Sequence, residues 1–157
     1  DTASLGVTDY IDEESTITIA GVEYKFLHVP GHTQDSVIIC IDGHIFTGDF
    51  LFNGDAGVGR DDLPSGRFLE HWNSIQSLSV LPDHVLVCSG HEPPGTELQT
   101  LGWNREHNPI LTMGSFEEFV EWQTQTAEKL GSVSKIKTAL PANIFAEIPD
   151  DIPWLSQ

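Results

Sequence analysis

Three short turns in the sequence each combine a glycine with a side chain that can bind a metal ion. They are Pro30-Gly31-His32-Thr33, Thr47-Gly48-Asp49 and Ser89-Gly90-His91-Glu92. Each turn follows a strand-like run, and its glycine lets the backbone turn sharply so that a metal ion or a substrate can come close. Two imidazoles and one carboxylate are a ligand set that suits Fe(II) or Zn(II). The sequence therefore predicts that His32, Asp49 and His91 form a metal site at the ends of adjacent strands.

The other histidines have no comparable setting. Without a glycine turn beside it, a histidine is more often structural or solvent-facing than a metal ligand. We therefore expect surface or structural roles for His44, His71, His84 and His107, and a packed or solvent-facing position for His28.

The elements that must position these turns are strands, followed by a helix, a further strand and a helical C-terminal region. Alternating or continuous apolar residues predict the strands, and apolar residues three to four positions apart predict a helix. Asp42-Gly43 is typical of a hairpin turn, and a capping box at Ser115 opens a helix that ends before Gly131. The predicted strands are 16–19, 22–29, 37–41, 44–47 and 84–88, the predicted helices are 68–78 and 115–130, and a long loop spans 50–66.

Charge is the strongest feature of the composition. The 157 residues include 24 acidic residues against 7 lysines and arginines, which gives a formal net charge of −17. Such a surface repels phosphate backbones and anionic lipid headgroups, so we expect neither nucleic-acid nor membrane partners. The longest apolar runs fall far short of the roughly 20 residues that span a membrane, and no signal peptide is recognisable at the start of the sequence.

The two cysteines indicate a reducing environment. Cys40 and Cys88 both lie within apolar runs, which is typical of small buried thiols rather than of a disulfide framework. We therefore expect the protein in the cytoplasm or in an organelle matrix.

The three metal-binding turns also carry a family resemblance. The later metal motifs of the metallo-β-lactamase superfamily are similar to three segments of this chain, Pro30-Gly31-His32-Thr33, Phe46-Thr47-Gly48-Asp49 and Gly90-His91-Glu92. Within that superfamily the chain resembles the branch that holds glyoxalase II and the persulfide dioxygenases. The Gly-Cys-Gly-Arg segment of this branch resembles Gly57-Val58-Gly59-Arg60, with Val58 where cysteine is common.

The C-terminal half of the sequence resembles the persulfide dioxygenases in particular. The similar segments are Asn108-Pro109, the stretch from Ser115 to Phe119, and Leu140-Pro141-Ala142-Asn143. This resemblance implies an α/β (α+β) fold, the αββα sandwich of the superfamily, with metal at the strand ends. The superfamily's first metal motif, His-x-His-x-Asp-His, does not occur in the sequence. We therefore expect residues 1–157 to form a single partial domain, the C-terminal part of the sandwich.

For the persulfide dioxygenases the resemblance implies one Fe(II) ion held by two histidines and one aspartate. His32 and Asp49 match two of these ligands and are the expected catalytic residues, while the third belongs to the missing motif. His91 matches the residue that holds a second metal ion in glyoxalase II. In such a dinuclear Zn(II) enzyme, Asp49 would bridge the two metal ions.

Arg60 has two possible roles. By resemblance it lies in the loop beside the pocket, where a fixed cation could bind a carboxylate of a glutathione-type substrate. It could equally form a surface salt bridge with Asp61 or Asp62.

Three functions remain open at this point. The leading expectation is the C-terminal part of an iron-dependent persulfide dioxygenase-like enzyme, which converts glutathione persulfide and O₂ to sulfite and glutathione, with this chain alone impaired. The second is a zinc-dependent thioester hydrolase of the glyoxalase II kind. The third is a non-catalytic half-domain that associates with a second copy or with a complementing chain.

Overall fold

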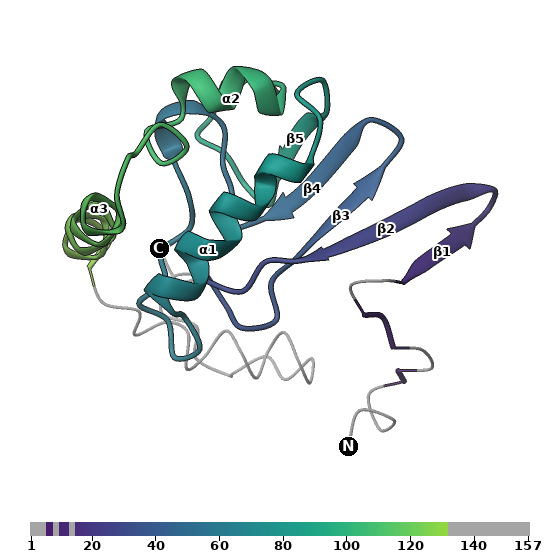
Figure 1. Ribbon diagram of the computed structural model, residues 1–157, viewed down its shortest axis with the longest axis horizontal. Helices are drawn as coiled ribbons and strands as arrows, with labels where there is room; N and C mark the ends of the chain where they lie inside the picture. Colours follow the sequence, from purple (N-terminus) through teal and green to yellow (C-terminus); the bar gives the residue numbers. More distant parts are fainter. Residues whose placement is uncertain (1–5, 8–9, 13–14, 132–157) are drawn as a thin grey trace, which may run out of the picture. The chain divides into compact units, whose positions relative to one another are not determined.

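The computed structural model describes residues 6–7, 10–12 and 15–131. The chain divides into two compact units, one formed by Asp1–Tyr10 with Gly131–Gln157 and the other by Ile11–Leu130. All the helices and strands described lie in the second unit (Figure 1). The dioxygenase-like segment Leu140-Pro141-Ala142-Asn143 lies outside the described residues, and the single-domain organisation of residues 1–157 stays a prediction.

A five-stranded sheet in the order β1-β2-β3-β4-β5 is the frame of this unit. The first four strands pair as antiparallel neighbours in chain order, and β5 pairs in parallel with β4. The sequence predicts all five strands, with ends that differ from the observed ones by at most two residues. Their bounds are β1 Thr16–Ile19, β2 Val22–His28, β3 Val37–Ile41, β4 His44–Gly48 and β5 Leu86–Ser89.

The register of the sheet brings the three glycine turns to one edge. His28 at the end of β2 pairs with Val37 at the start of β3, so the loop that carries His32 leaves this edge. Gly48 at the end of β4 pairs with Ser89 at the end of the parallel strand β5. The opposite end of β3 and β4 is closed by the predicted Asp42-Gly43 hairpin turn, whose positive φ angles of 39° and 75° are those that such a turn requires.

The described residues form three α-helices, α1 (Phe68–Ser77), α2 (Leu101–His107) and α3 (Phe116–Leu130), and two short 3-10 helices, η2 (Gly54–Ala56) and η3 (Leu78–Val80). Helix α3 contacts α1 rather than the strands (Figure 1). The capping box at the start of α3 is confirmed, because the Ser115 hydroxyl accepts a hydrogen bond from the Glu118 backbone N–H at 3.2 Å. Thr100 caps α2 in the same way through the Trp103 N–H. None of the helices in the described part of the chain has both the length and the apolar character that crossing a membrane requires.

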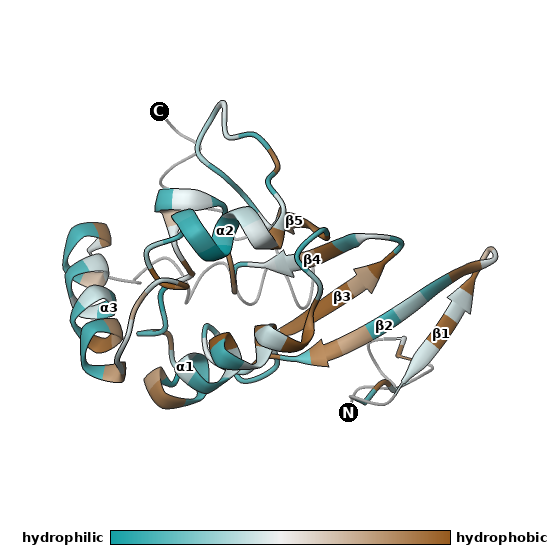
Figure 2. Cartoon of the chain, turned by 45° about the horizontal axis from the view of Figure 1, so that its top comes forward, coloured by the Kyte–Doolittle hydropathy of each residue, from teal (hydrophilic) through white to brown (hydrophobic). Residues whose placement is uncertain are grey.

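Helix α1 lies over one face of the sheet (Figure 1), and the hydrophobic core includes residues of both. Ile38, Ile45 and Val87 are almost fully buried there, together with Ile75 of α1. Strand β3 is apolar along its whole length (Figure 2), but the residues of β4 alternate between buried and exposed. On the other face Phe46 is 44% exposed. The apolar spacing that predicts this helix includes Leu69, but Leu69 lies away from the core and is 57% exposed.

Candidate functional site

The three predicted metal-binding side chains meet at the carboxylate of Asp49. Asp49 directly follows β4, His32 lies in the β2–β3 loop, and His91 lies two residues beyond β5. The His91 Nδ1 atom is 3.1 Å from Asp49 Oδ1, and the His32 Nε2 atom is 3.8 Å from Asp49 Oδ2. The two imidazoles thus face the two oxygens of one carboxylate.

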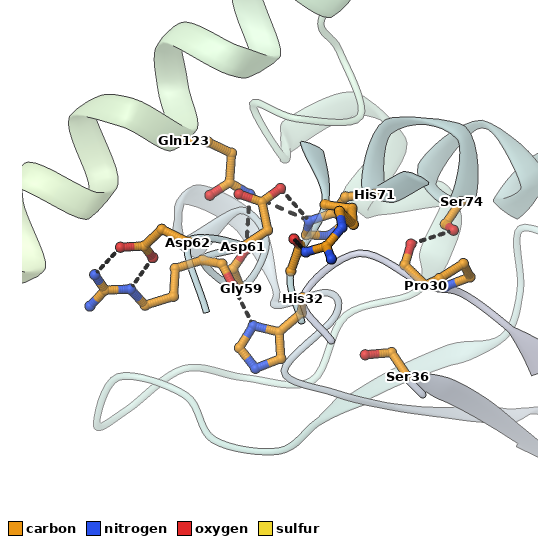
Figure 3. Close-up of polar contacts among 12 residues, drawn as sticks. Pro30, His32, Ser36, Gly59, Asp61, Asp62, His71, Ser74 and Gln123 are labelled. Atoms are coloured by element: carbon orange, nitrogen blue, oxygen red, sulfur yellow. Dashed lines mark hydrogen bonds and ion pairs between the residues drawn. The ribbon is translucent and has the colours of Figure 1, made fainter. Parts of the chain in front are cut away.

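The protonation of the His32 ring follows from its second partner. Its Nδ1 atom is 2.5 Å from the backbone carbonyl oxygen of Arg60 (Figure 3), and because a carbonyl can only accept, Nδ1 carries the proton and donates it. In the neutral ring Nε2 is therefore an unprotonated nitrogen, and its lone pair faces the Asp49 carboxylate. A cation or a proton between these two electron-rich atoms would stabilise this arrangement. A histidine that donates one N–H to a backbone carbonyl and offers the other nitrogen is the usual arrangement of a metal ligand.

Two glycines make room for this arrangement. A Cβ atom on Gly59 would lie 1.9 Å from the Asp49 carbonyl oxygen and 2.8 Å from His32 Nδ1. A Cβ atom on Gly90 would lie 2.6 Å from Asp49 Oδ1. The close approach of three chain segments around Asp49 thus depends on both glycines, of which the turn motifs of the sequence indicate only Gly90.

The donor set fits a metal ion in part. Within the described residues, no group of three or more His, Cys, Asp and Glu side chains is arranged to hold a metal ion. His32 and Asp49 supply two facing donors, and His91 contacts Asp49 from the other side. The three-residue metal site of the sequence analysis therefore remains a prediction.

His91 is held differently from His32. Its side chain is 72% exposed, and its ring packs on Phe52 with centroids 5.0 Å apart. The neighbouring Glu92 anchors the loop, because its Oε1 atom accepts hydrogen bonds from the Asn53 backbone and side-chain N–H groups and from the Ser89 hydroxyl, at 2.6–3.0 Å.

A pocket of about 520 Å³ opens beside Asp49. His32, Asp49 and His91 form one part of its wall, Phe52 and Trp122 form an apolar part, and Arg60 and Lys129 add two cations. The sequence does not indicate Lys129 as a pocket residue, because no motif surrounds it and it reaches the pocket only through the packing of α3. Asp55 and Glu92 also line the pocket, so it offers charged groups of both signs and an apolar wall beside the metal-binding side chains.

Arg60 lies beside the pocket and also forms the predicted salt bridge with Asp62. It lines the pocket, and its Nε and Nη2 atoms donate to the two carboxylate oxygens of Asp62 at 2.5 and 2.6 Å. These hydrogen bonds raise the pKa of Arg60 and hold the pKa of Asp62 below its usual range. The two parallel hydrogen bonds to Asp62 fix the Arg60 guanidinium beside the pocket. Binding of a substrate carboxylate by Arg60 stays a prediction.

The site has polar neighbours that the sequence analysis did not identify as functional. Asp61 and His71 form a buried pair with Nδ1 and Oδ2 3.2 Å apart, and Gln123 of α3 lies beside them (Figure 3). Burial raises the pKa of Asp61, although the His71 hydrogen bond opposes this. His71 thus has the structural position that was one of its two expected roles, whereas His44, His84 and His107 are exposed.

Comparison with known proteins gives one family match and many relatives. The family model described as "Metallo-beta-lactamase superfamily" matches residues 5–91. A hydroxyacylglutathione hydrolase of Xanthomonas campestris pv. campestris is 38% identical over 85 residues, which are 54% of this chain and 32% of the relative. The chain spans about a third of the length of the curated relatives that it matches.

Solved structures of similar fold agree with this match. ETHE1 from Myxococcus xanthus aligns with a TM-score of 0.75 and 29% identity, over 87% of this chain and 59% of that chain. TTHA1623, solved in a di-iron-bound form, aligns with a TM-score of 0.55 and 32% identity, over 67% of this chain and 49% of that chain. Here too the similarity covers only part of the known structures.

Proposed function

Since this chain belongs to the metallo-beta-lactamase superfamily, we propose that it is the C-terminal part of an iron-dependent persulfide dioxygenase-like enzyme. The superfamily and the fold class predicted from the sequence, a part of the metallo-β-lactamase fold, are confirmed by the family match and the structural alignment. The enzyme would oxidise glutathione persulfide with O₂ and water to sulfite and glutathione, so that two oxygen atoms of sulfite come from O₂ and one from water.

One observation carries this proposal: the His32 Nε2 lone pair faces Asp49 Oδ2 at 3.8 Å while Nδ1 is committed to the Arg60 carbonyl. His32 and Asp49 would hold Fe(II), together with a third ligand that the described residues do not supply. Fe(II) would offer coordination sites for O₂ and for the persulfide sulfur. TTHA1623 supports the choice of iron, because it binds two iron ions on a similar fold. Arg60 and Lys129 would bind the carboxylates of glutathione, and Phe52 and Trp122 would exclude water from the reacting end of the pocket.

The test combines metal content with O₂ uptake. The chain is loaded with Fe(II) without air, alone and together with the N-terminal part of a relative that carries His-x-His-x-Asp-His, and glutathione persulfide is then added in air. We expect O₂ consumption and sulfite in the complemented sample, and loss of both with His32→Ala. The matched control is His44→Ala, because His44 is an exposed imidazole at the opposite end of β4. Absence of iron and of O₂ uptake in both samples would exclude a dioxygenase.

A zinc-dependent thioester hydrolase is the second candidate. The observation in its favour is that Asp49 contacts His32 with one oxygen and His91 with the other, as a carboxylate between two metal ions would. The hydroxyacylglutathione hydrolase relatives support it as well. Two bound Zn(II) ions, with release of thiol from S-lactoylglutathione and without O₂ uptake, would favour this function over the first.

Association through the open sheet face is the third candidate. Phe46 is 44% exposed and lies in register between Ile39 and Cys88, so these side chains form an apolar row across β3, β4 and β5. Exposed apolar rows of this kind favour a second copy or a complementing chain. Size-exclusion chromatography tests this candidate, and a monomer that binds metal tightly would contradict it.

The compartment is proposed on chemical grounds alone. Cys40 and Cys88 are both free thiols, and burial raises the pKa of each. Such thiols suit the reducing cytoplasm or an organelle matrix.

A further inference from the structure

Behind His32, and outside the lining of the pocket, lies a cluster of three buried polar side chains, Asp61, His71 and Gln123 (Figure 3). Their exposed fractions are 3%, 0% and 1%. The pocket, the metal-binding side chains and the family motifs leave all three without a role. Because burying polar groups is costly, their arrangement calls for a physical account.

His71 lies where two chain segments meet. A Cβ atom on Gly31 would be 2.4 Å from the His71 Cβ atom, so α1 packs directly against the residue before His32. The Arg67 backbone N–H, one turn earlier, donates to the Gly31 carbonyl at 3.0 Å. On its other side the His71 ring donates from Nδ1 to Asp61 Oδ2 at 3.2 Å. His71 thereby joins the segment of His32 to the segment of Arg60.

Gln123 holds the second of these segments from the other end. Its Nε2 atom donates to the Gly59 carbonyl at 2.9 Å and lies 3.5 Å from His71 Nδ1. Arg60 therefore stands between two residues, Gly59 and Asp61, that are both fixed from behind by buried hydrogen bonds. The Arg60 carbonyl is the group that accepts the hydrogen bond from His32 Nδ1–H.

We propose that Asp61, His71 and Gln123 form a positioning unit that aims the Arg60 carbonyl at His32, and so keeps His32 in the Nδ1–H tautomer with Nε2 directed at Asp49. None of the three touches Asp49 or the pocket in the contacts described, so they act through the backbone. The importance of the unit for metal binding rests on the proposed function, but its effect on the tautomer does not.

The test is a measurement of the His32 tautomer by long-range ¹H–¹⁵N NMR, at a pH where imidazoles are neutral. In the unsubstituted chain His32 is expected to be protonated at Nδ1. The Gln123→Met variant keeps the volume but removes the bond to the Gly59 carbonyl, and it is expected to give a mixture of both tautomers. The matched control is Gln125→Met on the exposed face of the same helix, where the Gln125 amide donates to Glu121, and this variant should leave His32 unchanged.

A titration with Co²⁺ alone links the unit to metal binding. Loss of an outer-shell partner typically weakens metal affinity 10- to 100-fold, and we expect about a tenfold weaker Co²⁺ affinity for Gln123→Met than for Gln125→Met. If no form of the chain binds Co²⁺, the proposed metal function fails while the tautomer measurement still decides this inference. Two results would overturn it: an Nε2–H tautomer at His32 in the unsubstituted chain, or a folded Gln123→Met variant whose His32 tautomer is unchanged.

Discussion

The two histidines that face Asp49 are held in different ways. His32 is only 17% exposed, its ring is fixed by the Arg60 carbonyl, and buried polar groups support that carbonyl from behind. His91 is 72% exposed, and its loop is anchored by the single carboxylate of Glu92. A ligand held by a buried network keeps its geometry before metal arrives, whereas a ligand on an exposed loop adjusts to what binds.

This difference bears on the choice between the two enzymatic functions. A mononuclear iron site needs the rigid pair His32 and Asp49 together with a third ligand. A dinuclear zinc site also needs His91 in a fixed position. If the protein binds metal as proposed, the more buried His32 side would take the first ion, and His91 would decide whether a second ion follows.

The largest expected effect follows from substitution of His71, which supports the buried His32 side of the site. In His71→Leu the buried Asp61 carboxyl loses its hydrogen-bond partner, and breaking one member of a buried pair costs about 4 kcal/mol. Urea unfolding measures this loss, with His44→Leu as the exposed control. The double variant Asp61→Leu with His71→Leu should recover part of the stability, because it removes the unpaired polar group. A loss below about 1 kcal/mol would show that Asp61 finds another partner.

The sequence predicts the local features of this fold well. Hydrophobic alternation predicts the five strands, and Ser115 with Glu118 predicts the start of α3, because both signals lie within a few neighbouring residues. The glycine turns also predict that His32, Asp49 and His91 come together. The support from His71 and Gln123 could not be predicted, since it joins α1 and α3 to a loop far away in the chain.

The errors have similar causes. Leu69 has the spacing of a buried residue, but only the packing of α1 on the sheet decides which apolar residues of the helix are covered. Helix α2 has just seven residues, and its cap at Thr100 is a weak signal without the tertiary contacts of Leu101 and Asn104. Lys129 reaches the pocket through the placement of α3, which the sequence pattern does not specify.

The second prediction compares the two glycines of the site. Gly59→Ala would place a Cβ atom 1.9 Å from a backbone oxygen of Asp49, which cannot move without shifting the chain, so we expect a loss of about 3 kcal/mol. Gly90→Ala would meet first the carboxylate oxygen of Asp49, a side chain that can rotate, so we expect about 1 kcal/mol. Thermal unfolding gives the comparison, and Gly114→Ala is the control because its nearest contact is 3.9 Å away. Equal losses for Gly59→Ala and Gly90→Ala would mean that the two sides are equally stiff.

The third prediction concerns Glu92, which anchors the exposed loop of His91. Glu92→Ala removes three hydrogen bonds and leaves the Asn53 backbone N–H unpaired, which should cost about 2 kcal/mol. We expect the His91 loop to loosen while the His32 tautomer remains, as amide hydrogen exchange and NMR can measure. The control is Glu97→Ala on an exposed loop residue. A change at His32 as large as that at His91 would contradict the separation of the two sides.

The smallest effect is expected in the pH dependence of stability. The pKa of Asp62 is lowered mainly by its hydrogen bonds to Arg60, so its contribution is present above the usual carboxyl range and is lost as the pH falls through the lowered value. The pKa of Asp61 is raised by burial, against the opposing His71 contact and with a smaller contribution from Asp62, so stability is lost as the pH rises through the raised value. Asp62→Asn should therefore destabilise the protein near neutral pH but not in acid, and Asp61→Asn should show the opposite slope relative to the unsubstituted chain. Urea midpoints between about pH 3 and pH 7 measure both slopes. Parallel slopes would mean that Asp61 is as well solvated as its neighbour, and the buried support of His32 would then lose its physical basis.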